Sequence, residues 1–99
     1  MKITEVIQEA MVVMQVDGRV DTVTSPELQN AILLALQKKK NLILDFGAVD
    51  YVSSAGLRSL LMGHKTAISK GGSMTLTNVP EMVMEVFAMT GFDQVLQIK

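Results

Sequence analysis

The 99-residue sequence lacks cysteine and tryptophan and contains a single histidine, His64. Without cysteine, the chain can form no disulfide, Cys-ligated zinc site, iron–sulfur cluster or catalytic thiolate. One histidine also excludes a site with several His ligands within one chain. No run of about 18 uninterrupted apolar residues is present, so we expect no transmembrane helix and no membrane partner.

Excess charge of either sign is also missing. Nine Lys and Arg residues face ten Asp and Glu residues, which gives a formal net charge of -1. There is therefore no broad basic field for phosphates, and we expect no nucleic-acid partner. The chain acquires charge within residues 1–5 and shows no apolar signal core, so we expect a cytoplasmic protein. Because it has neither a phosphate-binding loop nor a dinucleotide fingerprint, we expect no bound cofactor.

Apolar residues make up 48% of the chain and charged residues 19%, which indicates one folded domain over residues 1–99. Residues 3–10 and 11–16 are predicted to form two strands joined by a hairpin, the second ending at the turn pair Asp17–Gly18. A predicted helix then begins near Thr24. Either Thr24 forms a capping box with Glu27, or Ser25 caps the helix and Pro26 takes its first position.

The rest of the chain alternates between strands and helices. The first helix is predicted to end at residues 38–40. Residues 41–46 predict a strand buried on both faces, followed by a loop over 47–52. A second helix is predicted from the serine pair to Gly71, a strand over 73–78, a third helix from Pro80 to Gly91, and a strand over 94–98. The order β-β-α-β-α-β-α-β predicts an α/β fold with a mixed, mostly parallel sheet of four to five strands and helices packed on it.

A serine hydrolase is the first chemistry to consider, with Ser53 or Ser54 as the nucleophile, His64 as the base and an Asp as the third member. Ser54 and His64 lie ten residues apart on one predicted helix, or roughly 15 Å along its axis. A nucleophile and its base must lie within about 3 Å of each other. The spacing therefore argues against an enzyme.

Four carboxylates come at or just after the predicted ends of strands: Asp17, Asp21, Asp45 and Asp50. Ligands bind beyond the carboxyl ends of strands in open α/β sheets, so these residues could form a cation site. No spacing among them matches a calcium or magnesium loop. Turn and capping roles are the more common use of Asp, and we expect no metal.

The serine pair lies where a buried strand leads into a helix, a place where serine commonly caps the helix. The same segment, with Asp45 followed by Ser54–Ala55–Gly56–Leu57, resembles the STAS-domain family, specifically the bacterial anti-sigma factor antagonists. Residues 18–21 (Gly-Arg-Val-Asp) and 24–28 (Thr-Ser-Pro-Glu-Leu) resemble a second block of that family. The resemblance extends over nearly the whole chain and implies a STAS-like fold.

This resemblance implies that Ser54 is phosphorylated by a partner serine kinase that is also an anti-sigma factor. The kinase would supply ATP and magnesium, and a serine phosphatase is a further expected partner. Unphosphorylated antagonist would bind the kinase and release the sigma factor. Many family members carry Asp directly before the acceptor where this chain has Ser53, so Ser53 is a second candidate acceptor. The residues expected to contact the partner are Asp21, Asp50, Ser53, Ser54, Gly56 and Leu57.

A different partner is compatible with the same motif. The chain could instead be a STAS subunit that regulates a transporter ATPase or a signalling phosphatase. In either case a phosphate would add about -1.5 to -2 charge at the start of a helix, which tolerates negative charge. We expect Asp21, Asp45 and Asp50 to repel that phosphate from a desolvated interface. The modification should therefore change binding rather than folding.

Overall fold

The computed structural model describes residues 1–99 and contains one five-stranded sheet. Its strands lie in chain order across the sheet: β1 (Lys2–Ile7), β2 (Val12–Val20), β3 (Asn41–Val52), β4 (Ser73–Thr77) and β5 (Gln97–Ile98). β1 is antiparallel to β2, and every other neighbouring pair is parallel. The predicted fold class, a mixed and mostly parallel sheet with helices, is therefore confirmed.

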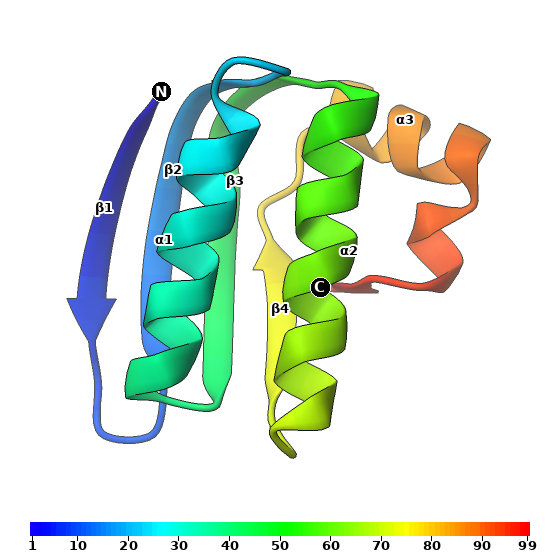
Figure 1. Ribbon diagram of the computed structural model, residues 1–99. Coiled ribbons are helices and arrows are strands. Elements are labelled where there is room, and N and C mark those ends of the chain that lie inside the picture. The colour runs from blue at the N-terminus through cyan, green and yellow to red at the C-terminus, as the bar shows by residue number, and fades with distance from the viewer.

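Three helices and one short 3₁₀ segment connect the parallel strands. They are α1 (Ser25–Lys38), α2 (Ser54–Ser69), α3 (Glu81–Thr90) and η1 (Phe92–Gln94). Figure 1 shows α1 and α2 side by side in front of the sheet, with α3 beyond α2 at one side. Right-handed crossovers that advance in one direction across a sheet place their helices on one face, which explains the layer formed by α1 and α2. None of these helices combines the length and apolar character that crossing a membrane requires.

The hydrophobic core lies between this helical layer and one face of the sheet. On β2 and β3, buried residues alternate with partly exposed ones, so that Leu42, Leu44 and Phe46 are buried whereas Ile43 is not. Leu28 and Ile32 of α1 complete the layer. The prediction that residues 41–46 are buried on both faces is therefore wrong, because helices cover only one side of this strand.

Both central strands are longer than predicted. β2 continues through Asp17–Gly18 to Val20, and β3 includes residues 47–52, which we expected to form a loop. The Asp-Gly pair does not turn the chain, because Gly18 remains in the strand with a left-handed φ of 109°. Glycine adopts this conformation without the steric cost that other residues incur.

Two irregularities in the β2–β3 pairing explain the altered pattern of side chains. One lies between Gln15 and Asp17, and the other lies between Gly18 and Arg19. At each one β3 contains an additional residue, as in a β-bulge. Buried side chains of β3 consequently recur at every third residue, at Phe46, Val49 and Val52. Strict alternation is the pattern by which a strand is recognised in sequence, and here the bulges remove it.

The ends of two other strands also differ from prediction. β1 ends at Ile7, and a turn closed by the Gln8 N–H donating to the Met11 carbonyl (2.8 Å) joins it to β2. The final strand contains only Gln97 and Ile98, because Gln94 belongs to η1 and the N–H groups of Val95 and Leu96 donate to the Phe92 carbonyl. In both cases a tight turn takes up residues that the composition alone assigns to a strand.

One-sided burial predicts different effects for two adjacent residues of β3. Leu44→Ala should cost about 2–5 kcal/mol of unfolding free energy, because it leaves a cavity under the helices. Ile43→Ala, on the partly open face, should cost clearly less. Urea unfolding of the two variants measures the difference, and equal losses would contradict one-sided packing.

Candidate functional site

The start of α2 is held directly against the end of β2. The Ser53 N–H donates to the Val20 carbonyl oxygen at 2.8 Å. A methyl group on Gly56 would lie 2.9 Å from that same oxygen and 2.8 Å from Cγ1 of Val20. Only glycine therefore fits at position 56 without displacing the main chain. Leu57 follows in the core, with 5% of its surface exposed.

The two serines have different positions at the start of this helix. Ser53 is the N-cap residue in an extended conformation, and its Oγ accepts a hydrogen bond from the Gly56 N–H at 3.2 Å. Ser54 is the first helical residue and is exposed. A serine N-cap satisfies one of the free N–H groups of the first turn. The Oγ of Ser53 thus has a structural role, whereas the hydroxyl of Ser54 faces solvent.

A tight turn organised by Asp21 precedes α1 at the same edge of the sheet, by which we mean the edge formed by the carboxyl ends of β2 and β3. Oδ1 of Asp21 accepts hydrogen bonds from the Val23 and Thr24 N–H groups, each at 3.0 Å. The Asp21 N–H donates to Oγ1 of Thr24 at 2.9 Å. Oγ1 of Thr24 in turn lies 2.7 Å from the carbonyl oxygen of Arg19. These bonds fix the chain between β2 and α1.

Neither predicted cap of α1 forms. Thr24 is the N-cap residue, but its side chain accepts no hydrogen bond from the first turn and instead joins the Asp21 turn. Ser25 is already helical, and Pro26 lies within the first turn. The predicted capping box with Glu27 is wrong, because the Thr24 hydroxyl is hydrogen-bonded to Asp21 instead. It accepts from the Asp21 N–H and lies 3.1 Å from Oδ1 of Asp21.

The same turn lowers the pKa of Asp21 below its ordinary value. The largest cause is the hydrogen bond from the Thr24 N–H, and the Thr24 hydroxyl, the Val23 N–H and Arg19 act in the same direction. Partial desolvation opposes them. Hydrogen bonds donated to a carboxylate favour its charged form. Asp21 therefore supplies a fixed negative charge at this edge.

The other predicted carboxylates do not all gather at the site. Asp50 is exposed near the end of β3. Asp45 lies seven residues before Val52, or about 23 Å along an extended strand. Its Oδ1 accepts a hydrogen bond from the Gly47 N–H at 2.9 Å. Asp45 is therefore not a neighbour of Ser54, and our expectation that it would repel a phosphate there is wrong.

The idea of a cation site is also wrong, because Asp17 and Asp45 lie within β2 and β3 rather than beyond the strand ends. No three residues among His, Cys, Asp and Glu come close enough together to hold a metal ion. The remaining acidic residues at the edge, Asp21 and Asp50, are the two that we expected to contact a partner.

Sequence reasoning missed two candidate functional residues, Arg19 and Tyr51, which contact each other. The guanidinium carbon of Arg19 lies 4.3 Å from the ring centre of Tyr51, and Nε of Arg19 lies 3.6 Å from Oδ2 of Asp21. Arg19 and Tyr51 are paired across β2 and β3. We did not find this contact because we expected residues 47–52 to be a loop. Tyr51 remains 42% exposed and Val23 85% exposed, so both offer apolar surface at this edge.

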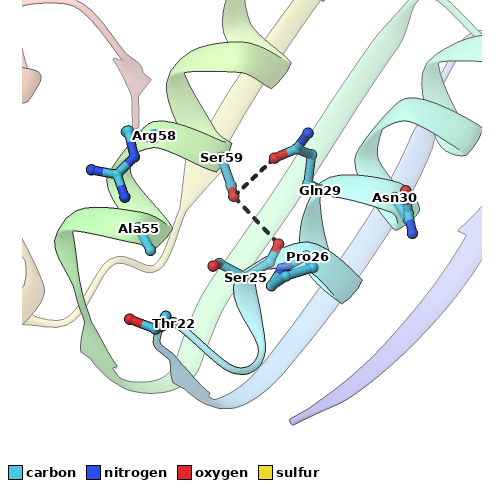
Figure 2. Close-up of a pocket in the computed structure, with 8 residues that line it drawn as sticks. All are labelled: Thr22, Ser25, Pro26, Gln29, Asn30, Ala55, Arg58 and Ser59. Carbon is cyan, nitrogen blue, oxygen red and sulfur yellow. Dashed lines mark hydrogen bonds between the residues drawn. The ribbon is translucent and has the colours of Figure 1, made fainter.

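A polar cleft of about 360 Å³ opens between the starts of α1 and α2. Figure 2 shows its lining, with Ser59 between Ser25 and Gln29. Oγ of Ser59 donates to the carbonyl of Ser25 at 3.3 Å and lies 3.4 Å from Oε1 of Gln29. Ser25 and Ser59 are each 4% exposed, so this bond joins the two helices within the molecule. Arg58 lies at the rim of the cleft.

Of the six residues expected to contact a partner, four lie at this edge with surface available: Asp21, Asp50, Ser53 and Ser54. Gly56 and Leu57 are buried beneath them. The structure gives these two residues a positioning role, since they set the height and direction of α2 against the sheet. The predicted acceptor is thus exposed at the end of the sheet where Asp21 and Asp50 also lie, next to the hydrogen-bonded junction between β2 and α2.

Comparison with known proteins gives a consistent result. A family model described as the STAS domain matches residues 2–99. BtrV of Bordetella bronchiseptica, described as an anti-sigma factor antagonist, is 31% identical over 93 residues, which cover 93% of this chain and 80% of BtrV. The anti-sigma-B factor antagonist of Bacillus subtilis is 26% identical over 82% of this chain and 74% of its own length.

Solved structures show the same fold. The unphosphorylated form of the anti-sigma factor antagonist SpoIIAA matches with a TM-score of 0.82 and 18% identity, over 99% of this chain and 88% of that one. The phosphorylated form of the Bacillus protein SpoIIAA matches with a TM-score of 0.75 and 17% identity, over 99% and 91% of the two chains.

The lowered pKa of Asp21 predicts how its contribution to stability depends on pH. A carboxylate whose pKa falls on folding stabilises the native state above its unfolded pKa, and this contribution disappears as the pH falls through the folded pKa. The difference in melting temperature between wild type and Asp21→Asn should therefore be largest near neutral pH and shrink below about pH 4. Thermal melts over a pH series measure this difference.

Asp50→Asn is the matched control, since it removes one exposed charge at the same edge. A difference for Asp21→Asn that stays constant down to pH 2 would show that the Asp21 turn does not depend on the carboxylate charge.

Proposed function

Because this chain belongs to the STAS domain family, we propose that it is an anti-sigma factor antagonist whose binding is switched by phosphorylation of Ser54. In its unmodified form it would bind an anti-sigma factor serine kinase, and the kinase would then release its sigma factor. The similarity to two named antagonists supports this proposal. We place the switch in the cytoplasm, where the kinase has access to ATP.

The observation that carries the proposal is the division of roles between two adjacent serines. Ser53 caps α2 through Oγ, whereas Ser54 is exposed one residue later. Transfer of the γ-phosphoryl group from ATP forms a bond from Oγ of Ser54 to phosphorus and breaks the bond to ADP. The hydroxyl proton passes to a base on the kinase. ATP and magnesium belong to the kinase, and the chain itself needs no cofactor.

Phosphorylation at this position should leave the fold intact. The first turn of α2 contains no acidic residue, so no carboxylate of the helix itself offsets the positive end of its dipole. A phosphate there interacts favourably with the helix dipole by about 0.3–1 kcal/mol at an exposed site. The same charge of about -1.5 to -2 would be costly at the centre of a desolvated interface. A loss of about 2.7 kcal/mol is enough to weaken binding 100-fold.

The surroundings of Ser54 provide a surface for such an interface. Tyr51 and Val23 expose apolar area, and Asp21 and Asp50 supply negative charge close by. Aromatic side chains are common anchors in protein interfaces, with charged residues around them. A phosphate added to Ser54 would increase the negative charge already present at this edge.

We infer that the chain has no catalytic activity of its own. Ser54 and His64 lie on the same helix, as predicted, and ten residues separate them. They cannot meet as nucleophile and base, because the helix places them roughly 15 Å apart.

Two substitutions at the acceptor test the switch. Ser54→Ala should fold normally and bind the kinase with unchanged affinity, but should not be phosphorylated. Ser54→Asp should bind at least tenfold more weakly, because it places a charge in the interface. Calorimetric titration against the purified kinase measures both affinities. Equal affinity for the phosphorylated and unmodified proteins would refute the proposal.

Phosphopeptide mapping distinguishes the two serines. After incubation with the kinase and ATP, we expect phosphate on Ser54 and none on Ser53. Ser53→Ala should lose about 1 kcal/mol of stability through loss of the cap, and should still be phosphorylated. Phosphate found only on Ser53 would contradict the assignment of the acceptor.

Capture of partners from the native cell tests the class of partner. Recovery of an anti-sigma factor kinase is expected. Recovery of a transporter ATPase or a signalling phosphatase in its place would refute the sigma-factor role and favour the alternative STAS function.

A further inference from the structure

Arg58 lies one helical turn after Ser54 on α2. Residues four apart on a helix are neighbours, with about 5–6 Å between their Cβ atoms. Long helical side chains lean back toward the N-terminus. In Figure 2 the guanidinium of Arg58 is directed toward the turn that contains Ala55. The cation is therefore positioned near the first turn, where Ser54 stands.

Arg58 has no acidic partner in the structure. The two ion pairs present join Arg19 to Asp21 and Lys38 to Glu5. Arg58 itself is exposed, and no acidic residue occupies the first turn of its helix. Ser54 thus lies at the positive end of the helix dipole, one turn before a guanidinium that forms no ion pair.

We propose that Arg58 binds the phosphoryl group once Ser54 carries it, forming an ion pair across one turn of α2. This inference rests on the proposed phosphorylation of Ser54. The planar guanidinium offers paired N–H donors that match phosphate oxygens. The hydroxyl of Ser54 is exposed, so the added group can turn toward Arg58 without disturbing the cap made by Ser53.

Such a pair changes two features of the surface at once. The modification adds negative charge at Ser54, and it also removes Arg58 as a free cation. An acidic group of the partner that faces Arg58 in the unmodified complex would then meet a neutralised guanidinium and a phosphate. Phosphorylation would therefore act on binding in two ways, by adding negative charge and by occupying a cation that the partner could otherwise contact.

Other charged groups contribute to the potential at Ser54. They lie on the segments next to the first turn of α2: Arg19 and Asp21 near the end of β2, Asp50 near the end of β3, and Glu27 in the first turn of α1. Arg19 is already paired with Asp21. Of the two arginines at this edge, only Arg58 is free to pair with a phosphate.

The test is a ³¹P NMR titration of the full chain with phosphoserine incorporated directly at position 54. In the wild-type background, Arg58 should favour the doubly charged phosphate. The second pKa of the phosphate should therefore lie about 0.15–0.4 unit lower than in Arg58→Gln. Arg58→Lys, which keeps the charge and loses the fork, should restore part of this shift.

Lys65→Gln is the matched control, because it removes an exposed cation from the same helix two turns further on. It should leave the phosphate pKa unchanged. Identical phosphate pKa values in wild type, Arg58→Gln and Lys65→Gln would overturn the ion pair. Phosphoserine is introduced here without a kinase, so the titration tests the ion pair alone. Whether a kinase phosphorylates Ser54 is tested separately by phosphopeptide mapping.

Discussion

The close contact between the start of α2 and the end of β2 determines the geometry of the whole site. The hydrogen bond from the Ser53 N–H to the Val20 carbonyl fixes the first residue of the helix relative to the sheet. The absence of a side chain at Gly56 allows that approach. A bulkier residue there would push the helix outward, and with it the serine that follows the cap. The position of Ser54 relative to the sheet is therefore set by backbone packing at Gly56, two residues later.

That contact depends in turn on two unusually long central strands. β2 and β3 reach the same edge because both continue past the positions where their sequences appear to stop. The bulges keep Val49 and Val52 buried, and they turn Asp50 and Tyr51 outward. Bulges re-aim side chains near functional sites in many sheets. Here they place Tyr51 opposite Arg19 and bring apolar surface to the edge that carries Ser54.

Local sequence signals predicted the parts of this structure that local interactions determine. The helix start at the serine pair and the order of strands and helices were predictable, because apolar spacing and capping act within a few residues. The length of β3 was not predictable in this way, since pairing with β2 makes a strand out of residues whose alternation is broken. Asp21 illustrates the same limit. Capping-box spacing in Thr24 and Glu27 was present, but a hydrogen-bonded turn three residues upstream took the threonine side chain.

The helix start at the serine pair was predicted correctly, whereas the charges around it were predicted less well. Ser54 was singled out by the resemblance to the STAS family, whereas Asp45 was assigned to its surroundings because the strand was expected to end there. Because Asp45 lies in the middle of β3, the acidic character of the edge depends on Asp21 and Asp50. The charge balance around Ser54 is then close enough to neutral for a single cation to matter. Arg58 is that cation, and its effect opposes that of the two carboxylates. A phosphate at Ser54 would be stabilised from the helix side and repelled from the strand side, so it should lie along α2 rather than over the sheet edge.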